Sequence, residues 1–404
     1  MSESVSLNQK AWKRLKRNKS AMFGLWVIAL AFFVAIFAYQ LTPDSTPDAN
    51  EQILELETHP PGFSVYILKV MKSADFDDHR GFFENFFFGK PSLYESVPIL
   101  KYRMKKDFMW ATVYKGMNFP TEEKKFQYTD IIKATQVKSK FNLYPISKIY
   151  SDTALYNQYQ QGLHDIIYKT RIVKKTYWLG TDRFGRDILS RLIIGVRVSL
   201  FVGLISVIIS LIIGVSLGAF AGYFRGWVDE VILWVINVFW AIPTLLLAMG
   251  LYVGAGNLIQ SKLLLIFVAV GLTMWVEVAR IVRGQFMGIR ELEYVTAAQS
   301  LGFSNMRTIF RHILPNLLGP IIVVACANFA NAILVESGLS YIGLGIQPPA
   351  PSWGGMLSEY RDFIDSNKAF LALAPGIAIM ILVLAFNLVG NGLRDALDVK
   401  GKVE

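Results

Sequence analysis

The segment Glu293–Asn316, "EYVTAAQSLGFSNMRTIFRHILPN", decides the fold, because it is polar and yet lies between two long apolar runs. Glu293–Leu301 has good helix formers and no breaker, which predicts a short helix. Gly302 suits a left-handed C-cap, and Pro315 marks the start of the next element. We therefore expect a short helix tethered between two membrane helices.

Two adjacent alanines, Ala297 and Ala298, predict a smooth face on this helix that another protein surface can approach closely. This interpretation makes the segment a docking element for a partner protein. The alternative is an interfacial helix that lies on lipid, but the segment is not strongly amphipathic, which disfavours that alternative.

The chain as a whole is too apolar for a water-soluble protein. Of its 404 residues, 53% are hydrophobic and 18% are charged, and the mean hydropathy is +0.38. Such a composition indicates that the bilayer is the solvent. Cys326 is the single cysteine, so no disulfide forms within the chain, and the four histidines show no metal-ligand spacing.

Six apolar runs predict an all-α polytopic membrane protein with six transmembrane helices. Ala21–Leu41 is uncharged and long enough to cross a hydrocarbon core of about 30 Å. Its length exceeds the apolar region of about 7–15 residues in a cleaved signal peptide, so we interpret it as an uncleaved span. The other predicted spans are about Ser199–Ala221, Val231–Val253, Leu263–Val282, Leu317–Ser337 and Phe370–Leu388. Pro243 and the Pro375–Gly376 pair lie inside such runs, where they favour kinks.

Basic residues predict the orientation of this arrangement. The short loops on the side opposite the N-terminus hold Lys262, Arg361 and Lys368. The segments on the N-terminal side hold Lys10, Lys13, Arg14, Lys16, Arg17, Lys19, Arg225, Arg280, Arg283, Arg290, Arg307, Arg311, Arg394, Lys400 and Lys402. The positive-inside rule then predicts that both termini and the segment Glu293–Asn316 are cytoplasmic.

The first connection, residues 42–178, is long enough to form a small extracytoplasmic domain. It opens with the linker-like "TPDSTPDANEQ" (Thr42–Gln52) and continues with Phe- and Tyr-rich sequence, which is untypical of disorder. Between positions 41 and 178 it has 19 Lys and Arg against 16 Asp and Glu, so it carries little of the net charge of +10. We predict a folded α+β module with the Phe82–Phe88 cluster in its packed core; a docking surface is the alternative for that cluster.

The segment Glu293–Asn316 resembles the conserved cytoplasmic loop of ABC-importer permeases. That loop reads Glu-Ala-Ala, three residues, Gly, nine residues, Ile-x-Leu-Pro. Thr296 replaces the Glu of the pattern and His312 its Ile, whereas "EYV" from Glu293 and the Leu301–Gly302 pair look typical of the peptide branch. The residues that fall on the family spacing are Ala297, Ala298, Gly302, Leu314 and Pro315.

Three more stretches are similar to the "C"-type subunit of the dipeptide/oligopeptide (peptide/nickel) permeases. They are Trp178–Leu200, Glu336–Leu357 and Leu384–Asp398, and the N-terminal "WKRLKRNKSAMFGL" also resembles that family. The resemblance covers about two-thirds of the chain, and roughly 100 residues of the first connection are extra. We therefore expect a cytoplasmic segment (1–20), a first span (21–41), a permease core (179–388) with a cytoplasmic coupling loop (283–316), and a cytoplasmic tail (389–404). The inserted extracytoplasmic domain (42–178) is a departure from the family, which the resemblance does not cover.

The resemblance implies the ABC type I importer permease fold in a bacterial inner (cytoplasmic) membrane, and a subunit that does no chemistry and binds no cofactor itself. The sequence agrees, because no GxxxxGK[ST] phosphate-binding loop occurs in it. ATP and Mg would belong to partner ATPase subunits, which act on the coupling loop. A second, different permease subunit and an extracytoplasmic substrate-binding protein complete the implied assembly, with di- or oligopeptides as cargo. The scattered charge gives no reason to expect nucleic acid as a partner.

Three polar residues in the fifth predicted span are candidates for lining the pore. Asn328 and Asn331 are three residues apart and so share a helix face, with helix–helix hydrogen bonding as the alternative. Glu336 sits near the outer end of the same span, where an ionisable group is a functional candidate. Before the second span, the arginines between Arg183 and Arg197 predict an amphipathic helix along the interface.

Two other functions remain open from the sequence. The first is a permease for nickel or another small solute, because the binding protein largely chooses the cargo. The second is a membrane-anchored receptor or assembly protein with a permease-derived core, which the long connection suggests and the intact coupling loop opposes. A membrane enzyme has no support, because no nucleophile–base or carboxylate pair is evident.

Overall fold

The computed structural model describes residues 7–72, 80–105, 108–117, 119–132, 153–256 and 258–397. Its contacts divide the chain into two compact units. Unit 1 combines Met1–Ile36, Gly195–Asp362 and Ala372–Glu404, and unit 2 combines Phe37–Ile194 with Phe363–Leu371. Lys400 and Lys402, in the predicted cytoplasmic tail, lie outside the described residues, as does residue range 133–152 of the predicted insertion.

Unit 1 consists of helices. Its elements are α1 Leu7–Arg17, α2 Lys19–Ile36, most of α9 Ile188–Phe224, α10 Gly226–Trp240, α11 Thr244–Gly254, α12 Lys262–Arg290, α13 Glu293–Ser300, α14 Asn305–Arg307, the π-helical turn Thr308–Ile313, the 3₁₀ turn Leu314–Leu317, α15 Leu318–Tyr341, α16 Trp353–Tyr360 and α17 Phe370–Leu397. Within the described residues, five helical segments are long and apolar enough to cross a membrane: α2, α9, α12, the run from α14 through α15, and α17. The pair α10–α11 makes a sixth if it is one broken span.

The break between α10 and α11 lies at a predicted kink. The two helices are bent by 93°, and Pro243 is the N-cap of α11. Proline has no backbone N–H, so it cannot continue the hydrogen bonding of the preceding helix. Pro375, by contrast, lies inside α17, which remains one helix from Phe370 to Leu397. The proline at 243 therefore separates two helices, whereas the proline at 375 lies within one continuous helix.

Helix α9 is longer than the span predicted from hydropathy. Its 37 residues measure about 55 Å at about 1.5 Å per residue, against a hydrocarbon core of about 30 Å. Three glycines bring α9 very close to α12. A Cβ at Gly214 would lie 2.5 Å from the Val278 Cβ, and one at Gly218 would lie 2.5 Å from the Ala279 carbonyl oxygen. Gly222 approaches the backbone of Arg283 in the same way, so these small residues allow backbone-to-backbone packing within the membrane.

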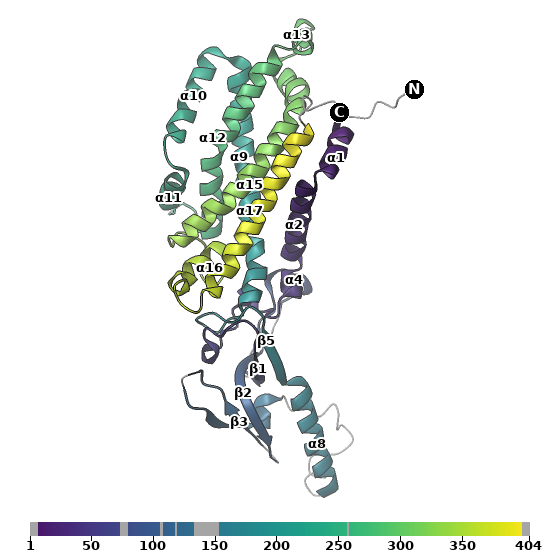
Figure 1. The fold of residues 1–404 in the computed structure, drawn as a ribbon, viewed down its shortest axis with the longest axis vertical. Helices are drawn as coiled ribbons and strands as arrows, with labels where there is room; N and C mark the ends of the chain where they lie inside the picture. The colour runs from purple at the N-terminus through teal and green to yellow at the C-terminus, as the bar shows by residue number, and fades with distance from the viewer. Residues whose placement is uncertain are drawn as a thin grey trace, which may run out of the picture. The chain divides into compact units, whose positions relative to one another are not determined.

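Helix α1 and the end of α17 lie at the end of unit 1 that carries α13 (Figure 1). A small apolar cluster joins them, in which Leu15 and Ala21 from α1 and α2 pack against Ala396 of α17. Helix α16 lies at the opposite end of unit 1, where it packs on α15. The start of α1, the end of α17 and α13 therefore share one side of unit 1.

Unit 2 contains a five-stranded antiparallel sheet in the order β4-β3-β2-β1-β5. Its strands are β1 Phe63–Met71, β2 Tyr94–Met104, β3 Phe108–Val113, β4 Glu122–Gln127 and β5 Ile172–Tyr177. Its helices are α3 Ala38–Leu41, α4 Phe82–Phe88, α5 Tyr128–Ile131, α8 Thr153–Thr170 and the first turns of α9, with short 3₁₀ turns at Pro47–Ala49 and Leu54–Leu56. Sheet and helices together make the mixed α and β content that the sequence predicts.

The sheet of unit 2 has a core on each face, because side chains alternate along β1. Leu68 joins a cluster with Ile99, Met109 and residues of α8 such as Ile167. Ile67, its neighbour, joins a second cluster on the other face, with Val65, Tyr177, Ile53 and Leu56. The chain that leads from the first span into the sheet therefore covers one face of β1.

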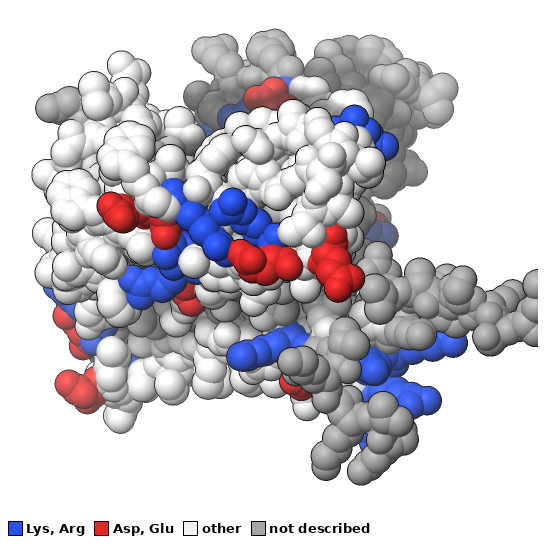
Figure 2. Space-filling model, turned by 90° about the horizontal axis from the view of Figure 1, so that it is seen from above, with Lys and Arg blue, Asp and Glu red and all other residues white. Residues whose placement is uncertain are grey.

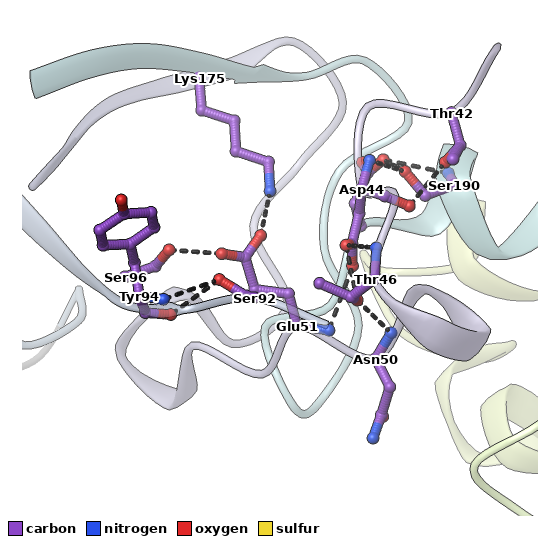
Figure 3. A network of polar contacts seen from close by, with 11 residues as sticks. Thr42, Asp44, Thr46, Asn50, Glu51, Ser92, Tyr94, Ser96, Lys175 and Ser190 are labelled. Carbon is purple, nitrogen blue, oxygen red and sulfur yellow. Dashed lines mark hydrogen bonds and ion pairs between the residues drawn. The ribbon is translucent and has the colours of Figure 1, made fainter. Parts of the chain in front are cut away.

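The segment Thr42–Gln52 is held in place by polar contacts and is not a free linker (Figure 3). The backbone N–H of Asp44 donates to Ser190 Oγ at 3.0 Å, and its carboxylate accepts from Thr46 and from the Glu51 backbone. Glu51 in turn accepts hydrogen bonds from Lys175 Nζ at 2.7 Å and from the Ser96 hydroxyl. The sequence suggested a linker; here the Glu51 side chain binds the segment to β2 and β5, and the Asp44 backbone N–H binds it to Ser190 of α9.

Burial and charge act together on the titratable groups of this network. Burial raises the pKa of Asp44, and the nearby Glu51 carboxylate raises it further. Burial alone would raise the pKa of Glu51, but the Lys175 ammonium and the hydrogen bonds from Lys175 and Ser96 lower it below its usual value. Burial opposes the charged form of Lys175, but Glu51 raises its pKa above the ordinary range. Glu51 and Lys175 are therefore ionised together at neutral pH.

Two predictions about unit 2 are wrong. The arginines before the second span do not form an exposed interfacial helix, because Arg186 and Arg191 are buried beside the Asp182 carboxylate, with Arg186 Nε 2.7 Å from Asp182 Oδ2. The cluster Phe82–Phe88 is not in the packed core, because Phe82 and Phe83 are each 77% exposed. In both cases residue type alone could not show whether a partner lies elsewhere in the chain.

Candidate functional site

Helix α13 ends in the glycine cap that the sequence predicts. Gly302 has φ of +80°, a left-handed conformation that glycine adopts without a Cβ clash. The N–H of Gly302 donates to the Gln299 carbonyl at 2.9 Å, and the N–H of Phe303 donates to the Ala298 carbonyl at 3.2 Å. These two bonds form a Schellman motif, which satisfies the last carbonyls of the helix and stops it at a fixed residue.

One side of α13 is buried in unit 1 and the other is open. Val295 is fully buried and Ala298 is 4% exposed, whereas Ala297 is exposed and Leu301 is 74% exposed. The prediction of a smooth face built from both alanines is therefore wrong for Ala298. Adjacent residues on a helix point about 100° apart, so one alanine packs inward while the other faces out. The outward face carries Ala297, Leu301 and Tyr294.

A hydrophobic cluster anchors α13 to the membrane helices. Val295 is its contribution to this cluster, and Leu314 packs against the same cluster from the 3₁₀ turn. The buried members come from α9, α12, α13, the π-helical turn, the 3₁₀ turn and α15: Ala219, Tyr223, Val278, Val282, Phe286, Val295, Ile309, Ile313, Leu317 and Val324. The ends of α9, α12 and α15 that lie next to α13 thus form one packed body with this short helix.

Polar contacts add to this anchoring. The buried Tyr223 at the end of α9 donates from its hydroxyl to Asn305 Oδ1 at 3.0 Å, and Gln299 Nε2 donates to the same hydroxyl at 3.4 Å. Asn316 Nδ2 donates to the Tyr294 hydroxyl at 3.1 Å. These residues were not predicted from the sequence, because the partners of Tyr223 lie 76 and 82 positions away in the chain.

The remaining residues of the predicted site lie around this body. Glu293 and Thr296 are exposed on the first turn of α13. Pro315 is exposed in the first turn of the 3₁₀ turn Leu314–Leu317, which agrees with its predicted place at the start of an element. His312 stacks on Phe303 with ring centroids 5.4 Å apart, which links the π-helical turn to the residue after the cap.

Ion pairs surround the same end of unit 1. Arg283 of α12 makes two hydrogen bonds to the carboxylate of Asp229 on α10, at 2.5 and 2.7 Å. Arg225 lies 2.5 Å from Glu291, which directly follows α12 and its C-terminal Arg290. Figure 2 views the molecule from the end at which α13 is labelled in Figure 1, and it shows Lys and Arg side chains beside Asp and Glu side chains on a largely uncharged surface.

The three candidate pore residues of α15 are in different surroundings. Asn328 is fully buried and donates from Nδ2 to the Met274 carbonyl of α12 at 3.4 Å, which agrees with helix–helix hydrogen bonding. Glu336 is also fully buried, and its Oε1 accepts from the Ser340 hydroxyl at 2.7 Å where α16 packs on α15. Asn331 is exposed on α15. Of the three, only Asn331 presents a polar group on the surface of the chain.

Metal binding has no candidate among the described residues, where no group of three or more His, Cys, Asp or Glu side chains is placed to hold an ion. The site described above is the end of unit 1 around α13. It consists of a capped helix with one open face, packed on the ends of several long apolar helices.

Comparisons with known proteins match most of unit 1. Residues 214–401 match the family model described as binding-protein-dependent transport system inner membrane component, and residues 6–61 match the N-terminal TM domain of oligopeptide transport permease C. A dipeptide transport system permease protein from Alkalihalophilus pseudofirmus is 45% identical, covering 56% of this chain and 73% of the relative. An oligopeptide transport system permease protein from Bacillus subtilis is 37% identical, covering 61% and 79%.

Two further proteins are also similar to this chain. A glutathione transport system permease protein from Pectobacterium atrosepticum is 41% identical over 56% of this chain and 73% of the relative. A solved structure of the MetNI methionine ABC transporter in an inward facing conformation aligns with a TM-score of 0.45 and 18% identity, covering 52% of this chain and 97% of that chain.

Proposed function

The chain belongs to the family of C-type permease subunits of ABC peptide importers, and from this premise we propose that it forms half of a translocation path for di- or oligopeptides. Its curated relatives named for dipeptide and oligopeptide transport support the peptide cargo. The family places it in the bacterial inner membrane as a multi-pass permease. ATP and Mg would be bound by separate ATPase subunits, and a second permease and an extracytoplasmic binding protein would complete the transporter.

The observation that carries the coupling role is the two-sided burial of α13. Its inner side, through Val295 and Ala298, is packed into the body formed by α9, α12 and α15. Its outer side, through Ala297 and Leu301, is free for an ATPase. A short helix that is bound firmly on one face and open on the other transmits the movement of a partner to the helices beneath it.

The proposed mechanism is a two-state coupling. When the ATPase subunits close on nucleotide, they move the docked α13, and the packed body moves α12 and α15 with it. Such coupling requires that the ATPase binds the two arrangements of the permease with different free energies. Asn331, exposed on α15, is the candidate to contact cargo in one of these arrangements.

We further propose six spans, with the pair α10–α11 as one broken span, and both termini in the cytoplasm with α13. The basic residues support this orientation, as does the position of α1, α13 and the end of α17 at one end of unit 1. The orientation can be tested with Ser300→Cys in a Cys326→Ala background. A membrane-impermeant maleimide should label inside-out vesicles and leave intact cells unlabelled, and the reverse result would refute the orientation.

Co-purification tests the assembly. A tagged chain should recover an ATPase, a second permease and an extracytoplasmic binding protein. The matched variant Ala297→Arg should lose the ATPase and retain the second permease. Recovery of the ATPase by both chains in equal amounts would contradict docking on the open face of α13.

Transport assays separate the remaining functions. Reconstituted vesicles should accumulate labelled peptide only with ATP and the complete assembly. Accumulation of nickel but not peptide would favour a small-solute permease. Binding of a ligand without ATP-dependent accumulation would favour the receptor or assembly protein that the insertion suggests.

A further inference from the structure

Helix α4 of unit 2 presents phenylalanine rings to its surroundings. Its sequence, Phe82–Phe88, is "FFENFFF". Phe82 and Phe83 are 77% exposed and Phe88 is 64% exposed. Rings of this size are costly to leave in water, so a group of them on one short helix indicates a partner surface.

Most of the phenylalanine rings lie on one side of the helix. With about 100° between successive residues, Phe82, Phe83, Phe86 and Phe87 share one side. Their rings also contact one another, with centroids 5.0 to 6.0 Å apart along the side. Glu84 lies on the opposite side, where Arg80 Nε is 3.6 Å from its carboxylate. The helix is therefore amphipathic, with an aromatic side and a charged side.

The aromatic side is fixed to the residues that directly follow the first apolar span. That span, α2, ends at Ile36, and Phe37 is the next residue. The Phe37 ring packs edge-on against the Phe86 ring at 6.0 Å. Gln40 Nε2 donates to the Phe86 carbonyl at 3.2 Å. Because Phe37 is covalently joined to the last residue of the span, the aromatic side of α4 lies one ring contact along from the residue that follows the span.

The C-terminal end of α4 is held as well. A Cβ at Gly89 would lie 2.6 Å from the Tyr39 ring, so α3 and the end of α4 touch closely. The N–H of Lys90 donates to the Ser45 carbonyl at 2.9 Å. The contacts of Phe86, Gly89 and Lys90 thus bind the C-terminal half of α4 and the residues after it to the segment Phe37–Ser45.

We propose that α4 is a membrane-surface anchor, whose phenylalanine side enters the bilayer at the interface where the first span ends. The occupant is lipid, because the exposed rings continue directly from the membrane-spanning α2 through Phe37, itself partly exposed. Amphipathic helices with aromatic residues on the apolar face bind such interfaces. Arg80 and the exposed Lys90 flank the rings, where long basic side chains reach the headgroups.

The anchor fixes the orientation of the inserted unit at the membrane. Together with the covalent connections to α2 and α9, it gives unit 2 an additional attachment to the bilayer. This role does not depend on the cargo or on ATPase docking, so it can fail while the proposed function holds, and the reverse is also true.

The test is spin-label accessibility of the full chain in phospholipid nanodiscs. A nitroxide is attached at Phe82→Cys or Phe83→Cys in a Cys326→Ala background. The control is Tyr168→Cys, an exposed position on α8, which lies away from α4 within unit 2 (Figure 1). Power-saturation measurements with oxygen, which concentrates in the bilayer, and with a water-soluble nickel chelate report the surroundings of each label.

The anchor predicts a several-fold higher ratio of oxygen to nickel accessibility at positions 82 and 83 than at position 168. Equal nickel accessibility at all three positions would overturn it, because the rings would then face water. Protection of positions 82 and 83 from both reagents would also overturn it, because protein and not lipid would cover the rings. Unchanged thermal unfolding of each labelled variant shows that α4 is still folded, and the two positions provide independent readings.

Discussion

Ala297 and Ala298 are neighbours with opposite surroundings: the Ala297 side chain is exposed, whereas Ala298 packs against the body of unit 1. This difference separates two effects that a substitution on α13 can have. A change at Ala297 alters the surface that a partner meets, and a change at Ala298 alters the attachment of the helix to its own chain. The two positions therefore form a matched pair for experiments.

We expect Ala297→Arg to abolish ATP-dependent uptake while leaving thermal stability within about 0.5 kcal/mol of the parent chain, because the position is exposed. Ala297→Ser should retain most of the uptake. Ala298→Arg should lower the free energy of unfolding by about 2 kcal/mol or more, because it forces a charge into a packed site. Thermal unfolding and vesicle uptake are measured on all three. Wild-type uptake by Ala297→Arg would refute the role of the open face.

Gly302 should tolerate residues according to their backbone preference alone. No atom lies within 4 Å of a Cβ added there, so only its φ of +80° penalises a side chain. We expect Gly302→Val to cost about 1–2 kcal/mol and Gly302→Asn less, because Asn adopts the left-handed region more readily. Hydrogen exchange of the Gly302 and Phe303 amides, which close the Schellman motif, should accelerate in the valine variant. Equal protection in both variants would show that the cap does not depend on residue 302.

The close packing of α9 on α12 predicts a difference between two glycine substitutions. Gly218→Ala should destabilise the chain by about 1–3 kcal/mol, because its Cβ would lie 2.5 Å from the Ala279 carbonyl oxygen and must push the helices apart. Gly284→Ala on α12 is the control, because nothing lies within 4 Å of its Cβ. It should stabilise the helix by up to about 1 kcal/mol. Thermal unfolding in the same detergent compares the two, and equal shifts would contradict the close approach.

The Glu51–Lys175 pair predicts a pH-dependent stability of unit 2. The folded pKa of Glu51 is below its ordinary value of 4.5, so its contribution is complete above pH 4.5 and is lost as the pH falls through the folded pKa. Glu51→Gln should therefore destabilise unit 2 at neutral pH by about 2 kcal/mol, and the gap to the parent chain should close in acid.

Comparing the parent chain with Glu51→Gln also reduces the effect of a second titrating group, Asp44. Asp44 has a raised pKa, so protonation of Asp44 in acid favours the folded state and opposes the loss at Glu51. Both chains keep Asp44, so the part of its pKa shift that comes from burial cancels in the difference between them. Hydrogen exchange of the β5 amides, measured across pH in both chains, reports this difference in the free energy of unfolding. A gap that widens below pH 4.5 would contradict the lowered pKa of Glu51.

Sequence patterns predicted those features that depend on local chemistry. The apolar runs indicated where membrane helices lie, Gly302 indicated the cap of α13, and Pro243 indicated a break that the structure places between α10 and α11. Each follows from the length of a run or from the backbone preference of one residue. The five-stranded sheet was anticipated only as a mixed α and β module, because strand pairing depends on residues far apart in the chain.

Features that depend on distant partners could not be predicted. The arginines between Arg183 and Arg197 were predicted to lie on an amphipathic interfacial helix, but Arg186 is buried in an ion pair with Asp182. The neighbouring Thr181 donates to the Leu56 carbonyl, which is 125 positions away in the chain. The phenylalanines of α4 were read as core, but the sheet fills its two cores without them. Asn328 and Asn331 share a helical face by spacing, yet one is covered by α12 and the other is open. Composition identifies which groups need partners, and only the fold determines where those partners are.

The hydrogen bond from the Asp44 N–H to Ser190 Oγ, 3.0 Å long, brings the entrance and the exit of the intervening chain to one point. A chain that leaves and returns at the same place can be exchanged without moving the helices on either side. A gene for such a protein can therefore gain, lose or replace the chain segment between these two residues by recombination. Replacing it with a two- or three-residue turn is the corresponding engineering route to a minimal version of the protein.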